Sequence, residues 1–387
     1  TTFSSDQIDL NYHNPDLFLE IVDILLFYVA QGAQFIRLDA VAFLWKKIGT
    51  SSIHLPQTHR IIQLMRKVLD VVAPGVAIIT ETNVPHEENI SYFGDGTNEA
   101  QMVYNFSLPP LTLHAFHTEN AETLSRWADS LSLPGDQVTF FNFLASHDGI
   151  GLTPVKGILS PAAIDEMVQR TQALGGFVSQ RTNLDGSFSP YELNINFLDA
   201  LGDPERNDES SELIVRRFLA SQAILLALQG VPGIYFHSLF GSRGWVEGVN
   251  ETGRVRTINR QKLAFSQLED ELNNPRTLRS AIFQGYFHLI EQRKSNPAFH
   301  PNSSQRILFC HEGVFCLLRS SIDESSHVLC LHNVTRGLQE IFIDTSHLPF
   351  AKGTTLTDLI SQRPIRSSKA KWKLKLEPYQ VFWLEGQ

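Results

Sequence analysis

The hydrophobic residues of the chain follow two spacings that alternate along the sequence. Segments with an apolar residue every three to four positions indicate amphipathic helices, and the clearest covers residues 56–72. Short apolar runs bounded by Gly, Pro, Asn or Asp indicate strands. Strands are predicted at 35–41, 76–82, 101–105, 138–145 and 231–236. Helices are predicted at 14–29, 56–72, 111–117, 121–131, 161–174, 213–228 and 276–294.

Alternation of strands with helices predicts a parallel sheet, and its repetition favours an α/β fold of the (β/α)8 TIM-barrel type. Only five barrel-type strands are found, where a closed barrel needs eight. We therefore expect that the first three strands are missing, that the chain is N-terminally truncated, and that this piece alone is inactive. Without them, the sheet would keep two unpaired edges.

The pattern changes after about residue 302. Short alternating strands at 307–310, 314–319, 327–333, 340–344 and 380–384 predict a small antiparallel β-domain. The expected domains are therefore 1–302, the rear two-thirds of a barrel, and 303–387. Residues 157–211 are expected to form an excursion over the active-site face that includes a Gly/Asn/Ser/Pro-rich loop at 175–190, and 238–260 is expected to be another long loop.

Composition excludes several classes of partner. The chain has 387 residues and a net charge of −9, with its basic residues scattered, which argues against nucleic acid and anionic membranes. No apolar run approaches the roughly 20 residues of a membrane span. Three cysteines without framework spacing indicate reduced thiols and a cytoplasmic location. No ligand spacing typical of a metal site is found, so no metal and no cofactor are predicted.

Three acidic residues follow the apolar runs of predicted strands, where each strand emerges into a loop: Asp39, Glu81 and Asp148. The carboxyl ends of parallel strands share one edge of a barrel, where catalytic residues gather. A single Asp at a strand end is more often a helix cap. Three such acids that repel one another are instead typical of catalysis, and carboxylate pairs are the usual means of breaking a glycosidic bond.

These motifs resemble those of glycoside hydrolase family 13, the α-amylase family of α-retaining glycosidases and transglucosidases. Arg37-Leu38-Asp39 is similar to the nucleophile motif on the fourth barrel strand, Glu81 to the acid/base on the fifth, and His147-Asp148 to the transition-state-stabilising motif on the seventh. Residues 104–110, 147–151 and 258–260 resemble the sucrose phosphorylase branch. Residues 81–89 and 189–194 look more like glucosylglycerate phosphorylases.

The resemblance implies a role for each acid. Asp39 would attack the anomeric carbon, and Arg37, on the same strand face, would hold it ionised. Glu81 would begin protonated, its pKa raised by burial and by the negative field of the other acids. Asp148 would hold sugar hydroxyls in the transition state, and His147 would donate to a neighbouring hydroxyl. A purely structural Arg–Asp pair is the alternative for Arg37 and Asp39.

Further residues are candidates for binding the substrates. Arg254, Arg256 and Arg260 form a basic loop, and guanidinium suits phosphate; by resemblance Arg256 is the candidate phosphate ligand, with a solvated basic loop as the alternative. Asn83, Tyr191 and Glu192 are candidate substrate-binding residues. The family's usual Lys-His after the nucleophile is replaced by Ala42-Phe43-Leu44-Trp45, which disfavours long glucans.

The predicted function is therefore a retaining α-glucoside phosphorylase that makes α-glucose 1-phosphate, with glucosylglycerate favoured as donor and sucrose next. Its partners would be a small α-glucoside and inorganic phosphate. One alternative is a glucosidase or transglucosidase that does not use phosphate. An alternative of another class is a catalytically idle barrel that serves as a scaffold.

Overall fold

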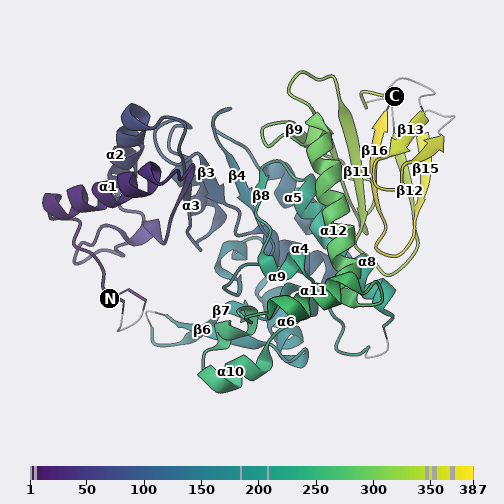
Figure 1. Ribbon diagram of the computed structural model, residues 1–387, viewed down its shortest axis with the longest axis horizontal. Helices are drawn as coiled ribbons and strands as arrows, with labels where there is room; N and C mark the ends of the chain where they lie inside the picture. The colour runs from purple at the N-terminus through teal and green to yellow at the C-terminus, as the bar shows by residue number, and fades with distance from the viewer. Residues whose placement is uncertain are drawn as a thin grey trace. The chain divides into compact units, whose positions relative to one another are not determined.

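The structure is a computed structural model that describes residues 2–3, 7–183, 185–206, 209–344, 348–350, 355–366 and 371–386. It divides into two compact units. The first comprises Thr1–Phe106 and Ser132–Phe141, and the second comprises Ser107–Leu131 and Asn142–Gln387. Each unit is described by itself, and Figure 1 labels elements of both where there is room.

The first unit holds four strands of a parallel sheet. They are β1 (Phe35–Leu38), β2 (Ala77–Thr80), β3 (Met102–Tyr104) and β4 (Thr139–Asn142, whose last residue belongs to the second unit). The pairs β1–β2, β2–β3 and β3–β4 are all parallel. The full sheet order is β1-β2-β3-β4-β8, so all five strands predicted from the sequence are present. The strand β8 (Val231–Pro232) lies in the second unit, where the amide of Gly233 donates to the Asn142 carbonyl.

Helices connect these strands as the spacing predicts. They are α1 (Pro15–Ala30), α2 (Pro56–Val72) and the short α3 (His86–Ile90). Asn14 caps α1, its side chain accepting from the amide of Asp16. Proline stands in the first turn of α1 and of α2, where its missing amide costs nothing. The face of α2 that carries Ile61, Ile62, Met65 and Leu69 is buried.

The second unit combines helices with antiparallel sheets. Its helices are α4 (Leu108–Thr118), α5 (Glu122–Ser130), α6 (Pro161–Ala173), α7 (Phe197–Ala200), α8 (Ser211–Ala227), α9 (Phe236–Leu239), α10 (Val246–Thr252), α11 (Phe265–Asn273) and α12 (Leu278–Ser295). Its strands β5 (Ile150–Gly151), β6 (Phe177–Thr182) and β7 (Phe188–Asn194) form a three-stranded sheet in the order β5-β7-β6.

The last part of the chain is antiparallel β-structure, as its alternating pattern predicts. The order β14-β13-β16-β11-β10-β9 describes a six-stranded sheet, and β12 pairs with β15. The bounds are β9 (Ser304–Ile307), β10 (Val314–Ser320), β11 (His327–Asn333), β12 (Gln339–Asp344), β13 (Thr355–Asp358), β14 (Arg363–Arg366), β15 (Lys371–Leu376) and β16 (Val381–Gly386). The domain boundary at 302/303 stays a prediction.

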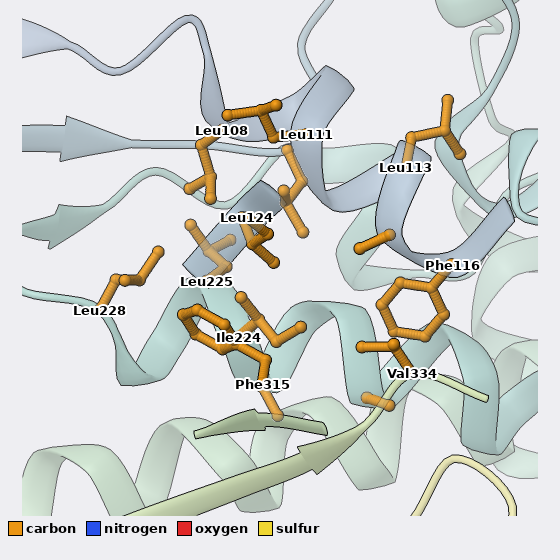
Figure 2. Close-up of a cluster of buried hydrophobic side chains, with 14 of the residues drawn as sticks. Leu108, Leu111, Leu113, Phe116, Leu124, Ile224, Leu225, Leu228, Phe315 and Val334 are labelled. Atoms are coloured by element: carbon orange, nitrogen blue, oxygen red, sulfur yellow. The ribbon is translucent and has the colours of Figure 1, made fainter. Parts of the chain in front are cut away.

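A hydrophobic core joins the helices of the second unit to this β-structure. Figure 2 shows side chains from α4, α5 and α8 packed together with Phe315 of β10 and Val334. Leu111, Leu124 and Ile224 are fully buried. Burying a leucine side chain contributes about 1.5–3 kcal/mol, so this cluster holds the unit together.

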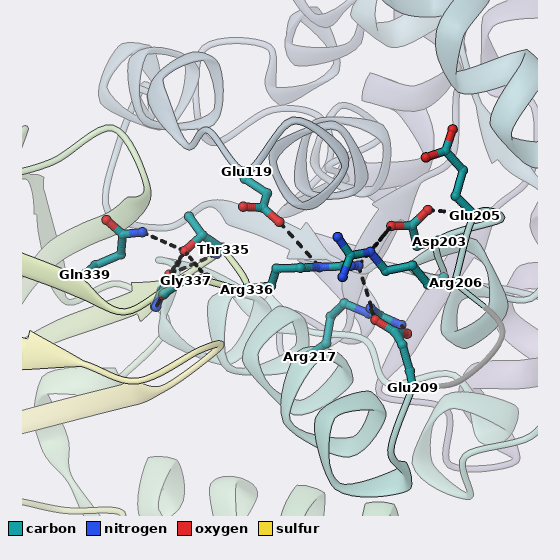
Figure 3. Close-up of polar contacts among 12 residues, drawn as sticks. Glu119, Asp203, Glu205, Arg206, Glu209, Arg217, Thr335, Arg336, Gly337 and Gln339 are labelled. Carbon is teal, nitrogen blue, oxygen red and sulfur yellow. Dashed lines mark hydrogen bonds and ion pairs between the residues drawn. The ribbon is translucent and has the colours of Figure 1, made fainter.

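Ion pairs add a second link within the same unit. Arg336, which follows β11, contacts Asp203 at 3.0 Å and Glu209 at 3.2 Å (Figure 3). Glu209 also forms a bidentate pair with the buried Arg217 of α8, with both distances 2.7 Å. Because these charges are paired, their burial is compatible with stability.

Several local predictions are wrong. Residues 175–190 were expected to be a loop, but β6 and β7 form a hairpin there, turning at Asn183, whose amide donates to the Ser187 carbonyl. The loop expected at 238–260 contains α10 and a 3-10 helix at Val255–Asn259. The strand expected at 138–145 ends at Asn142, whose carbonyl accepts from the amide of Gly233.

Candidate active site

The first group of candidate residues lies at the carboxyl ends of β1 and β2. Asp39 directly follows β1, and Glu81 directly follows β2. The amide of Glu81 donates to the Leu38 carbonyl at 3.0 Å, which extends the pairing of the two strands by one step. Parallel pairing therefore places both carboxylates at the same edge of the sheet.

The guanidinium of Arg37 contacts both of these carboxylates. Its Nη1 donates to Asp39 Oδ1 at 2.7 Å, and its Nη2 lies 3.8 Å from Glu81 Oε2. Burial pushes the pKa of Arg37 down, but Tyr104, Glu81 and Asp39 outweigh this effect, so its pKa is raised. A permanently charged group thus lies between two acids, an arrangement that reduces their mutual repulsion.

The surroundings of the two acids differ. The side chain of Asp39 is 73% exposed, whereas that of Glu81 is 16% exposed. Glu81 Oε2 accepts from the amide of Ala40 at 3.2 Å. Ala40 has φ 49° and ψ 38°, the left-handed region that a non-glycine residue seldom adopts. This turn directs the backbone amide after Asp39 toward Glu81, and such local strain is common at functional sites.

These contacts lead to a prediction about stereochemistry. Because both carboxylates touch one guanidinium, we expect their carboxyl groups to lie roughly 5–6 Å apart, as retaining glycosidases require. A crystal structure of the intact protein would measure this separation directly. A value near 9 Å, with a water molecule between the groups, would favour inversion and remove Asp39 as nucleophile.

The second group of candidate residues lies in the second unit. Asp148, six residues beyond the end of β4, forms ion pairs through Oδ1 with Arg260 Nη2 at 2.8 Å and with Arg256 Nη1 at 3.0 Å. The Nε of Arg260 also donates to the His147 carbonyl at 2.8 Å. Asn259 donates to the Asp148 carbonyl at 3.0 Å. The 256–260 segment thus holds the His147-Asp148 loop through several bonds.

Arg256 has a second acidic partner, Glu192. Its Nε and Nη2 donate to the two carboxylate oxygens of Glu192 at 2.9 and 3.0 Å, a bidentate pair. The Glu192 side chain is only 2% exposed, and burial raises its pKa although Arg256 opposes that effect. Tyr191 precedes Glu192 on β7, where its carbonyl accepts from the amide of Leu152.

The loop that carries Asp148 needs a glycine next to it. A Cβ at Gly149 would lie 2.5 Å from the Leu193 carbonyl oxygen and 2.6 Å from Glu192 Cγ. No side chain fits there without moving β7 away from the loop. Gly149 therefore allows Asp148 and the Glu192–Arg256 pair to lie close together.

The structure thus brings together two sets of predicted residues, one in each unit. Arg37, Asp39 and Glu81 form the first set; Asn83, two residues after Glu81, is half-buried. His147, Asp148, Glu192 and Arg256 form the second. Sequence reasoning missed the pairing of Arg256 with Glu192, and it gave no role to Tyr104 or Asn89. The roles of all these residues stay predictions.

Comparison with known proteins identifies the family. The model of the α-amylase catalytic domain matches residues 1–150. A glucosylglycerate phosphorylase of Spirochaeta thermophila is 48% identical over 388 residues, covering 99% of this chain and 65% of that protein. The chain belongs to the α-amylase family. The Escherichia coli glucosylglycerate phosphorylase is 46% identical, covering 100% of this chain and 66% of the relative.

More distant relatives of this chain include sucrose phosphorylases. That of Agrobacterium vitis is 30% identical and covers 78% of this chain. Among solved structures, sucrose 6F-phosphate phosphorylase from Thermoanaerobacter thermosaccharolyticum has a TM-score of 0.72 at 20% identity, covering 94% of this chain and 65% of the other. An α-amylase from H. orenii has a TM-score of 0.68 at 17% identity. These likenesses confirm the predicted (β/α)8-type fold with its β-domain.

Two further features concern the described part of the chain only. None of its helices combines the length and the apolar character that crossing a membrane requires. Among the same residues, no group of three or more His, Cys, Asp or Glu side chains is arranged to hold a metal ion.

Proposed function

We propose that the protein is a retaining α-glucoside phosphorylase whose donor is glucosylglycerate. The contact of one guanidinium, that of Arg37, with both Asp39 and Glu81 carries the catalytic part of this proposal. The identity of 46–48% to two glucosylglycerate phosphorylases supports the choice of reaction and donor. This chain spans about two-thirds of their length, so the activity is proposed for the whole protein.

The proposed reaction has two steps. Asp39 attacks the anomeric carbon, the bond to the glycerate oxygen breaks, and Glu81 gives its proton to that oxygen. A phosphate oxygen then attacks the same carbon, Glu81 takes its proton, and the bond to Asp39 breaks. Two inversions leave the product as α-glucose 1-phosphate.

The second group of residues would bind the glucosyl ring and phosphate. Asp148 would accept from sugar hydroxyls while His147 donates to another, and Tyr191 would line the acceptor side. In the first unit, Asn83 would contact the substrate. The free thiols Cys310, Cys316 and Cys330 support the expected cytoplasmic location, where thiols stay reduced.

The direct test uses the intact protein with glucosylglycerate or sucrose, with and without inorganic phosphate. We expect glucose 1-phosphate to form only with phosphate, and faster from glucosylglycerate. Free glucose as the main product at saturating phosphate would contradict phosphorolysis. It would support the second candidate, a glucosidase, which is favoured by the finding that Arg256 is already paired with two carboxylates.

Arg256→Ala is expected to raise the KM for phosphate by about tenfold or more, because loss of one charge-assisted contact costs about 1.5–3 kcal/mol. The KM for the glucoside should change far less. Initial rates over a matrix of both substrates measure the two constants. The matched control is Arg254→Ala, which removes an exposed arginine of the same loop. Equal effects of Arg256→Ala on both constants would mean that Arg256 does not bind phosphate.

A further inference from the structure

Arg37 has a third contact that neither the proposed reaction nor the sequence motifs explain. Its Nε donates to the hydroxyl of Tyr104, at the end of β3, at 3.1 Å. The guanidinium carbon also lies 5.4 Å from the centre of the Tyr104 ring. The other two contacts of Arg37 are to Asp39 and Glu81, both proposed to change charge or bonding during the reaction. Tyr104 is the neutral contact among the three.

This third contact determines how the whole guanidinium is oriented. A guanidinium is planar and presents its donors in a fixed fork. When Nε is held by Tyr104, the directions of Nη1 and Nη2 are set as well. Nη1 donates to Asp39 at 2.7 Å, and Nη2 lies near Glu81. The Tyr104 hydroxyl therefore affects the placement of both acids through one side chain.

Tyr104 is itself held from several sides. Its ring lies 4.6 Å from that of Phe141 on β4 and 5.6 Å from that of Phe106. Its carbonyl accepts from Asn89 Nδ2 at 2.6 Å. Asn89 Oδ1 in turn accepts from the Thr82 hydroxyl at 2.6 Å. The Asn89 and Thr82 side chains are buried, so water does not compete for these bonds.

A continuous set of contacts thus runs between the two acids. It passes from Asp39 through Arg37 to Tyr104, and from Tyr104 through Asn89 to Thr82, the neighbour of Glu81. All of these residues belong to the first unit. Three strand ends and α3 are joined in this way.

We propose that Tyr104 is a positioning residue that orients Arg37, and through it Asp39 and Glu81, for glucosyl transfer. Tyr104 acts through Arg37 and is not itself a catalytic residue. The inference rests on the proposed roles of the two acids, but not on the use of phosphate. A purely structural role, in which the ring only fills space between strands, is the competing explanation.

The test is Tyr104→Phe in the intact protein, which removes the hydroxyl and keeps the ring. With α-glucosyl fluoride as donor and water as acceptor, kcat should fall by about 10- to 100-fold, the effect of a small misplacement of reacting groups. KM should stay within about twofold. The matched control is Tyr92→Phe: Tyr92 is fully buried in the same unit, and its hydroxyl bonds to His54 Nδ1 at 2.8 Å. It should lower the melting temperature without changing kcat.

A double-mutant cycle separates positioning from structure. In an Arg37→Lys background, Tyr104→Phe should have almost no further effect on kcat, because the group that it orients is gone. An unchanged kcat in Tyr104→Phe, or the same fold-loss in both backgrounds, would overturn the proposal. Because glucosyl fluoride needs neither phosphate nor glycerate, failure of phosphorolysis would leave this result interpretable.

A crystal structure of the Tyr104→Phe variant gives a readout that does not depend on any activity. We expect the Arg37 guanidinium to rotate and its 2.7 Å contact with Asp39 to lengthen or break. An Arg37 side chain that keeps its orientation and both acidic contacts would show that Tyr104 does not position it, and would overturn the proposal.

Discussion

Asp39→Asn is expected to reduce the turnover of every glucosyl donor by at least about 10,000-fold, the scale of losing a nucleophile. An amide oxygen is too weak a nucleophile to form the covalent intermediate, and Asn cannot form the ion pair with Arg37. The unfolding free energy should change by less than about 1 kcal/mol, because an ion pair of an exposed carboxylate contributes little. Steady-state kinetics and thermal unfolding measure the two effects.

The matched control for Asp39 is Asp23→Asn, which makes the same change at an exposed position of α1. It should leave both turnover and stability unchanged. An Asp39→Asn variant that kept a rate close to that of the natural protein would show that Asp39 is not the nucleophile, and the pair with Arg37 would then be purely structural.

Glu81→Gln is expected to slow phosphorolysis of glucosylglycerate by about 100- to 10,000-fold, the usual contribution of a general acid–base. Transfer of glucose from glucosyl fluoride to Asp39 should suffer far less, because fluoride leaves without a proton donor. Comparing pre-steady-state rates for the two donors tests this difference. A variant that loses both reactions equally would point to a positioning role for Glu81.

The control for Glu81 is Glu87→Gln, an exposed carboxylate on α3. It lies shortly after Glu81 in the chain and undergoes the same chemical change. Activity within a factor of two of the natural protein is expected.

The sequence pattern predicted helices and strands best where the capping residues and the hydrophobic spacing indicated the same bounds. The bounds of α2 match the prediction because proline begins the helix and an uninterrupted apolar face defines its length. The hairpin of β6 and β7 was missed because its turn, around Gly186, has a composition typical of loops. The strand lengths were overestimated since pairing with neighbours, which a single sequence does not show, decides where a strand ends.

In the candidate site too, some contacts could be predicted from local sequence and others could not. Two-residue spacing on a strand was enough to predict that Arg37 and Asp39 contact each other, and the structure confirms this contact. The pairing of Glu192 with Arg256 joins residues 64 positions apart, through a hairpin that the sequence did not reveal. Contacts of this kind follow from tertiary packing, so no local pattern predicts them.

The most direct test of the proposed mechanism is to trap the covalent intermediate. The intact Glu81→Gln variant would be mixed with α-glucosyl fluoride without phosphate, quenched and digested, and its peptides analysed by mass spectrometry. If Asp39 is the nucleophile, one added glucosyl group is expected on the peptide that contains Asp39, attached to the Asp39 carboxylate itself. Turnover of the donor with no adduct, and a product of inverted anomeric configuration, would contradict it.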